Sequence, residues 1–425
     1  MKRFVAAALF LAACDGDAGT IVVSLATAPD SDLLASLDKL RITTTNPESV
    51  TEATRGSNGI DLSVKFDSTD TPGTIYVEGF DSAGTVVATG QSGPFTLAGG
   101  DASLVIYVAK PYSINEAPVR LGTGRSSLAA SPIVYGAVIA GGVDGAGSLT
   151  DQLSIYNVYS HSFQVGAAMP SKRRGQAINA DISGVVYLFG GTGENGTTTS
   201  TFYEFISTTA PSGSYLAAED QAGFERTDEV ALQVGPTSFV VTGNPPLAIT
   251  AGAITARSDL PALKGNGASY PKAPDGLTGA AAALSGDGNS LVVFDNESSA
   301  VFALPHTGSV AALPDGSFVV AGLGDAMHVT DTVTTLPSLS VARNEPTVAA
   351  TSRYVVVAGG LDAAMQPIAS ADILDATTLA LVTTVPILPR AHAQAVAMPN
   401  EQVMLVGGDV ASDVIELFTP PVPTD

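Results

Sequence analysis

Tryptophan is absent from this 425-residue chain, and cysteine occurs once, at Cys14. A single cysteine excludes an internal disulfide. Histidine is almost as scarce: His161, His306, His328 and His392 lie far apart, with no ligand spacing such as H-x-x-x-H. We therefore predict no metal site and no cofactor.

Basic residues are also few. The chain has 19 Lys and Arg against 41 Asp and Glu, a formal net charge of −22. This balance argues against nucleic acid as a partner, because nucleic-acid binding needs a basic footprint, and it disfavours docking on anionic lipid. A solvated negative surface favours solubility, and we expect a monomer. Acidic turns such as Asp144-Gly145 and Asp287-Gly288 lack the D-x-D-x-D-G calcium pattern, so ordinary turn chemistry is the preferred interpretation.

The apolar run near the N-terminus, residues 4–13, is too short to span a bilayer permanently. Lys2-Arg3 precede it and Cys14 follows it, the pattern of a secretion signal. Leu11-Ala12-Ala13-Cys14 resembles the bacterial lipobox, which implies acylation of Cys14 as the first mature residue. An ordinary signal peptide with an incidental cysteine, or a misplaced start codon, are the alternatives.

We thus expect a signal peptide over 1–13 and a Gly-containing tether over 14–19. The mature chain would be exported and anchored by lipid to a bacterial cell envelope, facing the periplasm or the cell surface.

A basic residue followed at a fixed distance by a Gly-Gly doublet recurs along the chain. The offset is sixteen residues in three pairs and seventeen in the last. The pairs are Arg125 with Gly141-Gly142, Arg174 with Gly190-Gly191, Arg343 with Gly359-Gly360, and Arg390 with Gly407-Gly408. The spacing within each pair is nearly constant, whereas the segments between successive pairs vary in length. This indicates one supersecondary unit copied several times.

Each copy has the composition of short strands in hairpins. Two apolar or alternating runs separated by a polar turn lie between the arginine and the glycines, rich in Val, Ile, Tyr and Phe. A third run carries an aromatic residue or Leu at a fixed place, and a weaker fourth run follows. The aromatic or Leu residues of the third run are Tyr156, Phe205, Leu374 and Phe418. Four strands over roughly 45–50 residues are typical of one blade of a β-propeller.

Three degenerate units fill the middle of the chain. Arg226 precedes the first, the second has its apolar run at 290–294 without an arginine, and His306 takes the arginine's place in the third. The total predicts seven blades, or six if the compressed 280–330 stretch forms one blade. Because the chain ends soon after Phe418, we expect residues 117–122 to supply the missing fourth strand and close the ring.

These residues resemble the kelch-repeat family of β-propellers, in a bacterial lipoprotein of the kelch-containing type. The resemblance covers roughly 115–420 and rests on the basic residue, the glycine doublet and the third-strand aromatic. The tryptophan that this family places in the fourth strand is missing. The resemblance implies a propeller that serves as a binding platform. Copper oxidases of this type need a cysteine cross-linked to tyrosine, which acylation of Cys14 would exclude.

Residues 20–110 lack the glycine spacing but contain six or seven short apolar or alternating runs. They predict a small β-sandwich, loosely immunoglobulin-like, that acts as a spacer above the membrane. Residues 111–116 would be a linker, 117–420 the propeller and 421–425 a tail. The predicted fold class is all-β throughout.

The candidate binding residues follow from the repeat. Antiparallel pairing would bring the basic residues and the acids after the glycines to one end of the ring, at the mouth of its channel. The candidates are Arg125, Arg174, Arg226, His306, Arg343, Arg390, Asp144, Asp325, Asp362 and Asp409. Two interpretations remain: a polar pocket for a sugar, peptide or anion, or arginines that pair with nearby acids and tie down backbone.

No nucleophile elbow such as G-x-S-x-G and no catalytic constellation is evident, so no catalytic residue is predicted. The sequence favours a non-catalytic, lipid-anchored protein whose propeller binds or scaffolds a protein or glycan. The alternative is a propeller enzyme acting on a carbohydrate, similar to an epimerase or mutarotase, with Arg and acidic residues at the channel mouth.

Overall fold

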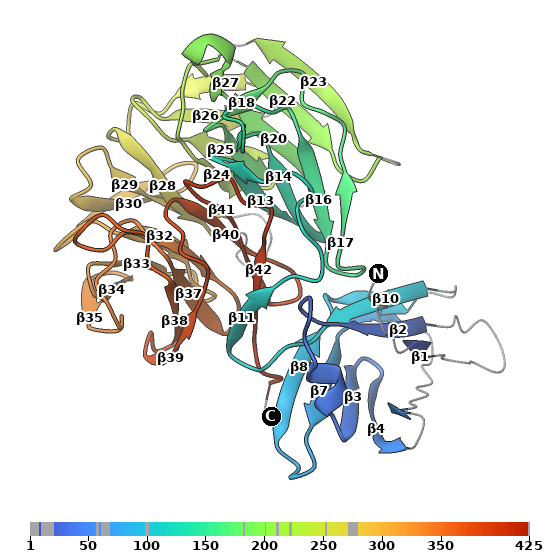
Figure 1. The fold of residues 1–425 in the computed structure, drawn as a ribbon. Coiled ribbons are helices and arrows are strands. Elements are labelled where there is room, and N and C mark those ends of the chain that lie inside the picture. Colours follow the sequence, from blue (N-terminus) through green and yellow to red (C-terminus); the bar gives the residue numbers. More distant parts are fainter. Residues whose placement is uncertain are drawn as a thin grey trace.

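A computed structural model shows a chain built almost entirely of antiparallel β-structure, with α1 (Leu33–Ser36) and η1 (Glu194–Gly196) as brief helical turns (Figure 1). The residues that it describes are 8–9, 21–56, 59–60, 69–97, 102–181, 183–199, 201–209, 212–220, 223–250, 253–270 and 279–423. Cys14 and its lipobox-like context lie outside these ranges.

Within the described ranges, seven four-stranded antiparallel sheets follow one another along the chain, here numbered sheets 1 to 7. Sheet 1 contains β13 (Ala129–Ile133), β14 (Gly136–Ala140), β16 (Leu153–Asn157) and β17 (Ser162–Val165). Sheet 2 contains β19 (Ala177–Ala180), β20 (Val185–Phe189), β22 (Thr201–Ile206) and β23 (Ser214–Asp220). Sheet 3 contains β24 (Ala231–Gly235), β25 (Ser238–Val241), β26 (Leu247–Thr250) and β27 (Ala253–Ala256).

The later sheets repeat the same order of strands. Sheet 4 contains β28 (Leu263–Ser269), β29 (Ala281–Ser285), β30 (Ser290–Phe294) and β31 (Ser299–Ala303). Sheet 5 contains β32 (Ser309–Ala312), β33 (Phe318–Gly322), β34 (Asp325–Val329) and β35 (Val333–Leu336). Sheet 6 contains β36 (Thr347–Ala350), β37 (Tyr354–Ala358), β38 (Ser370–Asp375) and β39 (Leu381–Pro386). Sheet 7 contains β40 (Ala393–Ala397), β41 (Val403–Gly407), β42 (Glu416–Thr419) and β11 (Ser113–Glu116).

The second strands are the most apolar, and all except that of sheet 2 are buried along their whole length. A strand covered on both faces needs such a run. Tyr156, Phe205, Leu374 and Phe418 lie in third strands as predicted, and all four are buried. One unit differs: the run 290–294 was expected to be a second strand but is β30, the third strand of sheet 4.

Neighbouring sheets pack face to face. The first strand of each sheet contacts the first strand of the next, and β40 of sheet 7 contacts β13 of sheet 1. A separate apolar cluster lies between each neighbouring pair, for example Ile133, Val138, Val186 and Leu188 between sheets 1 and 2. Corresponding clusters join sheets 2 with 3, 3 with 4, 4 with 5, 5 with 6, 6 with 7 and 7 with 1. This arrangement is compatible with a β-propeller.

Sheet 7 combines the two ends of this part of the chain. β11 pairs antiparallel with β42, with Ile114 opposite Phe418 (Figure 1). The strand therefore lies at Ser113–Glu116, inside the expected linker 111–116, and not at 117–122. Ser113–Glu116 has a single apolar residue and no strand pattern of its own, so its pairing depends on the apolar partner strand. Hydrogen bonds from Ala117 and Leu121 continue the contact beyond β11.

The N-terminal part forms separate sheets. A five-stranded sheet contains β5 (Gly59–Ile60), β4 (Glu48–Gly56), β3 (Lys39–Thr45), β7 (Ile75–Phe80) and β8 (Val86–Gln91). A second sheet contains β1 (Ala8–Leu9), β2 (Ile21–Ala26) and β10 (Ala102–Tyr107), in which β2 and β10 run parallel. β6 (Thr69–Gly73) pairs with β9 (Phe95–Leu97). Asp81–Gly84 form the hairpin loop that joins β7 to β8, and the Asp81 carboxylate accepts two backbone N–H groups there.

The N-terminal sheets pack against sheets 1 and 7 (Figure 1). Tyr107 lies in the apolar cluster between those sheets, and the Tyr159 hydroxyl donates to the Pro94 carbonyl at 2.7 Å. The Thr89 hydroxyl donates to Pro420 at 3.0 Å, so the C-terminal segment contacts this part as well. No helix in the described ranges has the length and apolar character needed to cross a bilayer.

Candidate functional site

The repeated arginines direct their guanidinium groups inward, to the carbonyl group that ends the second strand of their own sheet. This bond recurs in five sheets, over distances of 2.6–3.1 Å. The pairs are Arg125 with Gly141, Arg173 with Gly190, Arg226 with Thr242, Arg343 with Gly359 and Arg390 with Gly407. The constant offset in the sequence is therefore the span of one bonded hairpin.

In sheet 2 the arginine that makes this bond is Arg173, and the prediction of Arg174 was wrong by one residue. Both belong to β18 (Arg173–Arg174), which pairs with β21 (Thr192–Gly193). Adjacent residues of a strand point to opposite sides. Arg173 is fully buried and its guanidinium also bonds the Tyr203 hydroxyl at 2.7 Å, whereas Arg174 is exposed.

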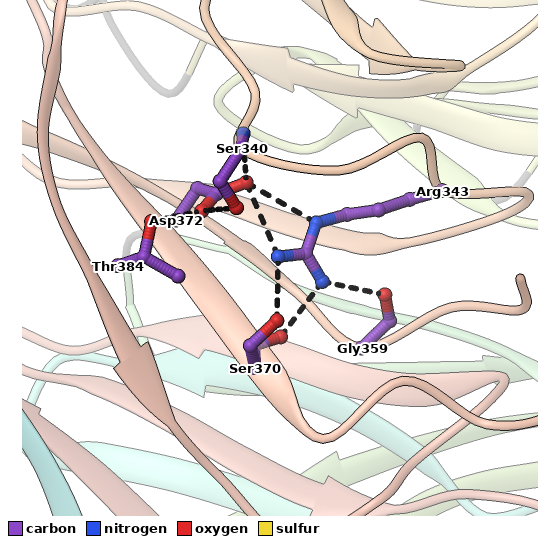
Figure 2. A network of polar contacts seen from close by, with 6 residues as sticks. All are labelled: Ser340, Arg343, Gly359, Ser370, Asp372 and Thr384. Carbon is purple, nitrogen blue, oxygen red and sulfur yellow. Dashed lines mark hydrogen bonds and ion pairs between the residues drawn. The ribbon is translucent and has the colours of Figure 1, made fainter.

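The third strand supplies a side-chain partner for the guanidinium. In sheet 6 this is Asp372, fully buried, 3.1 Å from Nη2 of Arg343 (Figure 2). The hydroxyls of Ser340 and Thr384 donate to the second Asp372 oxygen, and Ser370 accepts from Arg343 (Figure 2). A buried ion pair of this kind is tolerated because every polar atom around it is bonded.

The partner differs from sheet to sheet. Arg390 pairs with the buried Glu416 at 3.0 Å in sheet 7, but Arg125 meets only the Ser154 hydroxyl and two carbonyls in sheet 1. Without a carboxylate, burial lowers the pKa of Arg125 to about 10. Arg125 is still charged at neutral pH, and its charge is stabilised by neutral dipoles alone.

Three of the four glycine doublets join their sheet to the next one. Both glycines have positive φ, for example 59° at Gly359 and 85° at Gly360, a region open mainly to glycine. The Gly360 N–H then donates to the carbonyl of Arg390 in sheet 7, at 2.9 Å. Gly142 and Gly191 make the same bond to the arginine of the following sheet. The arginine–glycine pattern therefore holds one sheet together and connects it to its neighbour.

The acids that follow the glycines do not pair with the arginines, so that part of the second interpretation was wrong. Asp144 and Asp362 each accept two backbone N–H groups of their own turn. Asp325 lies 3.4 Å from Nε2 of His306, which occupies the arginine position of sheet 5 and whose Nδ1 lies 2.9 Å from the Thr307 carbonyl oxygen. Such carboxylate–backbone bonds are ordinary turn chemistry.

One polar cluster of exposed groups does span two sheets. His392 lies between two carboxylates, with Nδ1 2.8 Å from Asp409 and Nε2 2.9 Å from Glu345 of sheet 6. Burial lowers the pKa of His392, but the two hydrogen-bonded carboxylates outweigh it and raise the pKa above its usual value. The carboxylates of Asp409 and Glu345 bond different nitrogens of the imidazole and lie on opposite sides of it, so they do not converge on one point. Among the described residues, no three His, Cys, Asp or Glu could hold a metal ion.

The remaining histidines are parts of the packing. His161 is buried, bonds the Tyr156 hydroxyl at 2.7 Å, and has its pKa lowered to about 3 by burial. Nε2 of His328 lies 2.8 Å from the Ser317 hydroxyl beside a hairpin turn. Asp287 bonds within its own turn, as expected of ordinary turn chemistry. A similar Asp-Gly pair of the sequence, Asp275-Gly276, lies outside the described ranges.

Sequence reasoning missed a feature at the position two residues after each arginine. These residues have φ between 48° and 62°, although only one of them is glycine. They are Ser127, Gly175, Asp228, Glu345 and His392. The signal available in the sequence was their constant offset from the arginines.

Comparison with known proteins does not assign the chain to a family, because no family model and no curated protein matches it. The structure thus brings the arginines together with backbone and third-strand groups. It leaves Asp409 and His392 exposed, and Asp144, Asp325 and Asp362 half-buried. Arg226 lies between these cases, half-buried, with burial lowering its pKa.

Proposed function

We propose that the chain is a seven-bladed, kelch-like β-propeller that serves as a non-catalytic binding or scaffolding platform. In this proposal sheets 1 to 7 are the blades, and β11 closes the ring by completing sheet 7. The circuit of first-strand contacts and the apolar cluster between every neighbouring pair support the closed ring. The glycine doublets and buried arginines support the kelch-like repeat.

The observation that carries the platform function is the state of the arginines. Arg125, Arg173, Arg343 and Arg390 are buried and bond groups of their own sheets, so they offer no guanidinium to a substrate. An enzyme using a row of arginines at a channel mouth would need these groups directed at the ligand. The loops around them are the surface through which a platform would bind a protein or a glycan.

We further propose that the N-terminal segment exports the chain and that Cys14 carries the lipid. The N-terminal sheets, which we propose to be an immunoglobulin-like spacer, would then hold the propeller away from a bacterial membrane. Replacement of Cys14 by Ser should move the protein from membrane to soluble fractions. Retention in the membrane would refute the lipid anchor and leave the platform function standing.

Pull-down from native envelopes tests the platform function directly. The full chain should capture a partner reproducibly and should not change the anomeric ratio of free sugars followed by NMR. Sugar turnover that depends on the exposed Glu345 or Asp409 would instead favour the epimerase-like alternative. The variants to test are Glu345→Gln and Asp409→Asn, whose carboxylates pair with His392 and with none of the buried arginines, so loss of activity would not be attributed to loss of those arginine bonds.

A further inference from the structure

Exposed apolar side chains gather at the arginine–glycine end of sheets 5, 6 and 7. They lie in the loops that follow the second strands or lead into the first strands. They are Leu323, Val341, Met365, Leu388 and Val410, here called the apolar face. Their exposed fractions run from 42% to 76%. No large apolar residue is this exposed in the equivalent described loops of sheets 1 and 2, where Met169 is buried.

Backbone hydrogen bonds hold these loops together. The Leu323 N–H donates to the carbonyl of Arg343, and Leu339 donates to Gly324, which joins the loop of sheet 5 to the entry of sheet 6. The Gly360–Arg390 bond and the contact between Glu345 and His392 join sheet 6 to sheet 7. The apolar face therefore lies on one continuous, braced surface.

Two of these residues occupy an unfavourable backbone conformation. Leu323 has φ 49° and Met365 has φ 60°, in a region where bulky side chains are rare and glycine would relieve strain. Strained residues of this kind concentrate at ligand-binding positions. An exposed Leu or Met at such a place adds no core packing, which points to contacts made outside the chain.

The charge around the apolar face is negative. Asp409, Glu345 and Asp362 lie among the same loops. From residue 305 to residue 423 the only Lys and Arg are Arg343, Arg353 and Arg390. Arg343 and Arg390 are buried in ion pairs, and Arg353 contacts Gln91 and Pro421 beside the N-terminal sheets. Arg120 pairs with Asp413 in the loop that follows β41, and His392 bonds Glu345 and Asp409. The four carboxylates of these loops, Glu345, Asp362, Asp409 and Asp413, therefore still outnumber the two basic groups.

Resting on the proposed platform function, we propose that this face binds a cationic polypeptide segment in which Lys or Arg alternates with apolar residues. The apolar side chains would cover the apolar face, and the basic ones would pair with the carboxylates at its rim. Nucleic acid and anionic lipid would be repelled by the carboxylates. A neutral glycan would leave both the charge and the aliphatic surface unused.

The test uses the full chain and a fluorescent 14-residue peptide of alternating Lys and Leu. Comparison peptides carry Glu in place of Lys, or Ser in place of Leu. We expect micromolar binding of the Lys/Leu peptide only, weakened by salt. Substitution of Met365, Leu388 and Val410 together by Ser should raise Kd at least tenfold. Glu345→Gln with Asp409→Asn should raise Kd about tenfold and reduce the salt dependence.

The matched control substitutes three equally exposed residues on outer strands, Val165, Leu216 and Val301, by Ser. It should bind like the wild type, and thermal melting confirms that every variant is folded. The proposal is overturned if the three peptides bind alike, if none binds, or if the face variant and the control behave alike. A partner from native envelopes that still binds the face variant would preserve the platform function while refuting this inference.

Discussion

Replacement of Gly359 by Ala should destabilise the protein because this glycine makes the contact between sheets 6 and 7 possible. Its φ is 59°, and an added Cβ would overlap the carbonyl oxygen of Arg390. That oxygen accepts the 2.9 Å hydrogen bond from Gly360. The substitution therefore combines backbone strain with the loss of a bond between sheets.

The magnitude follows from three contributions. The left-handed conformation costs Ala about 1–2 kcal/mol, and a buried N–H left without its acceptor costs about 1–3 kcal/mol. Ala also lowers the conformational entropy of the unfolded chain, which offsets about 0.4–1 kcal/mol of this loss. We expect a net loss of roughly 2–4 kcal/mol in the free energy of unfolding, measured by urea titration with circular dichroism.

Two control glycines separate these contributions. Gly316 has φ 87° but open space around its Cβ position, so Gly316→Ala should cost only about 0–1.5 kcal/mol. Gly145 has neither a positive φ nor a neighbour, and Gly145→Ala should be neutral or stabilise by about 0.5 kcal/mol. If Gly359→Ala destabilises no more than Gly316→Ala, the glycine doublet does not connect the sheets as described.

Three further predictions concern buried groups. Asp372→Asn should cost about 3–5 kcal/mol in urea unfolding because it leaves the Arg343 guanidinium buried without its counter-ion, and a loss below 1 kcal/mol would refute the ion pair's role. His161 binds a proton more readily unfolded than folded, so stability should fall by about 1.4 kcal/mol per pH unit from pH 6.5 towards about 3. His161→Asn, which tolerates the positive φ at this position, should remove that slope; an unchanged slope would assign it to other groups. Ile114→Ala should cost about 2–4 kcal/mol, since this side chain packs between sheets 6 and 7, and an unchanged melting temperature would argue against β11 as a structural part of sheet 7.

The sequence predicts the repeat well because the arginine, the glycines and the apolar second strand are all local features. Sequence-based prediction fails where the position of a strand is determined by pairing with a neighbouring strand. β11 and the first strand of sheet 4, β28 (Leu263–Ser269), have weak patterns of their own, and pairing decides their position. The polar β4 (Glu48–Gly56) escaped notice for the same reason, since its side chains are exposed or only half-buried.

The candidate site was harder to predict than the fold. Periodicity could not choose between two adjacent arginines, because only the direction of each side chain separates them. The role of the acids was misjudged because carboxylates close to arginines in sequence also fit their own turns. The apolar face could not be predicted at all, since Leu and Met residues in a loop become informative only when their exposure is known.

Comparison of Arg173→Met with Arg174→Met tests the structural role of the arginines most directly, since the two residues are neighbours with opposite environments. Loss of the Arg173 guanidinium would remove its charge-assisted bonds to the Gly190 carbonyl and the Tyr203 hydroxyl, which would keep only the hydroxyls of Thr199 and Ser171 as partners. We predict a loss of roughly 3–5 kcal/mol in the free energy of unfolding for Arg173→Met, and a change within about 0.5 kcal/mol for Arg174→Met. Equal stability of the two variants would contradict the account.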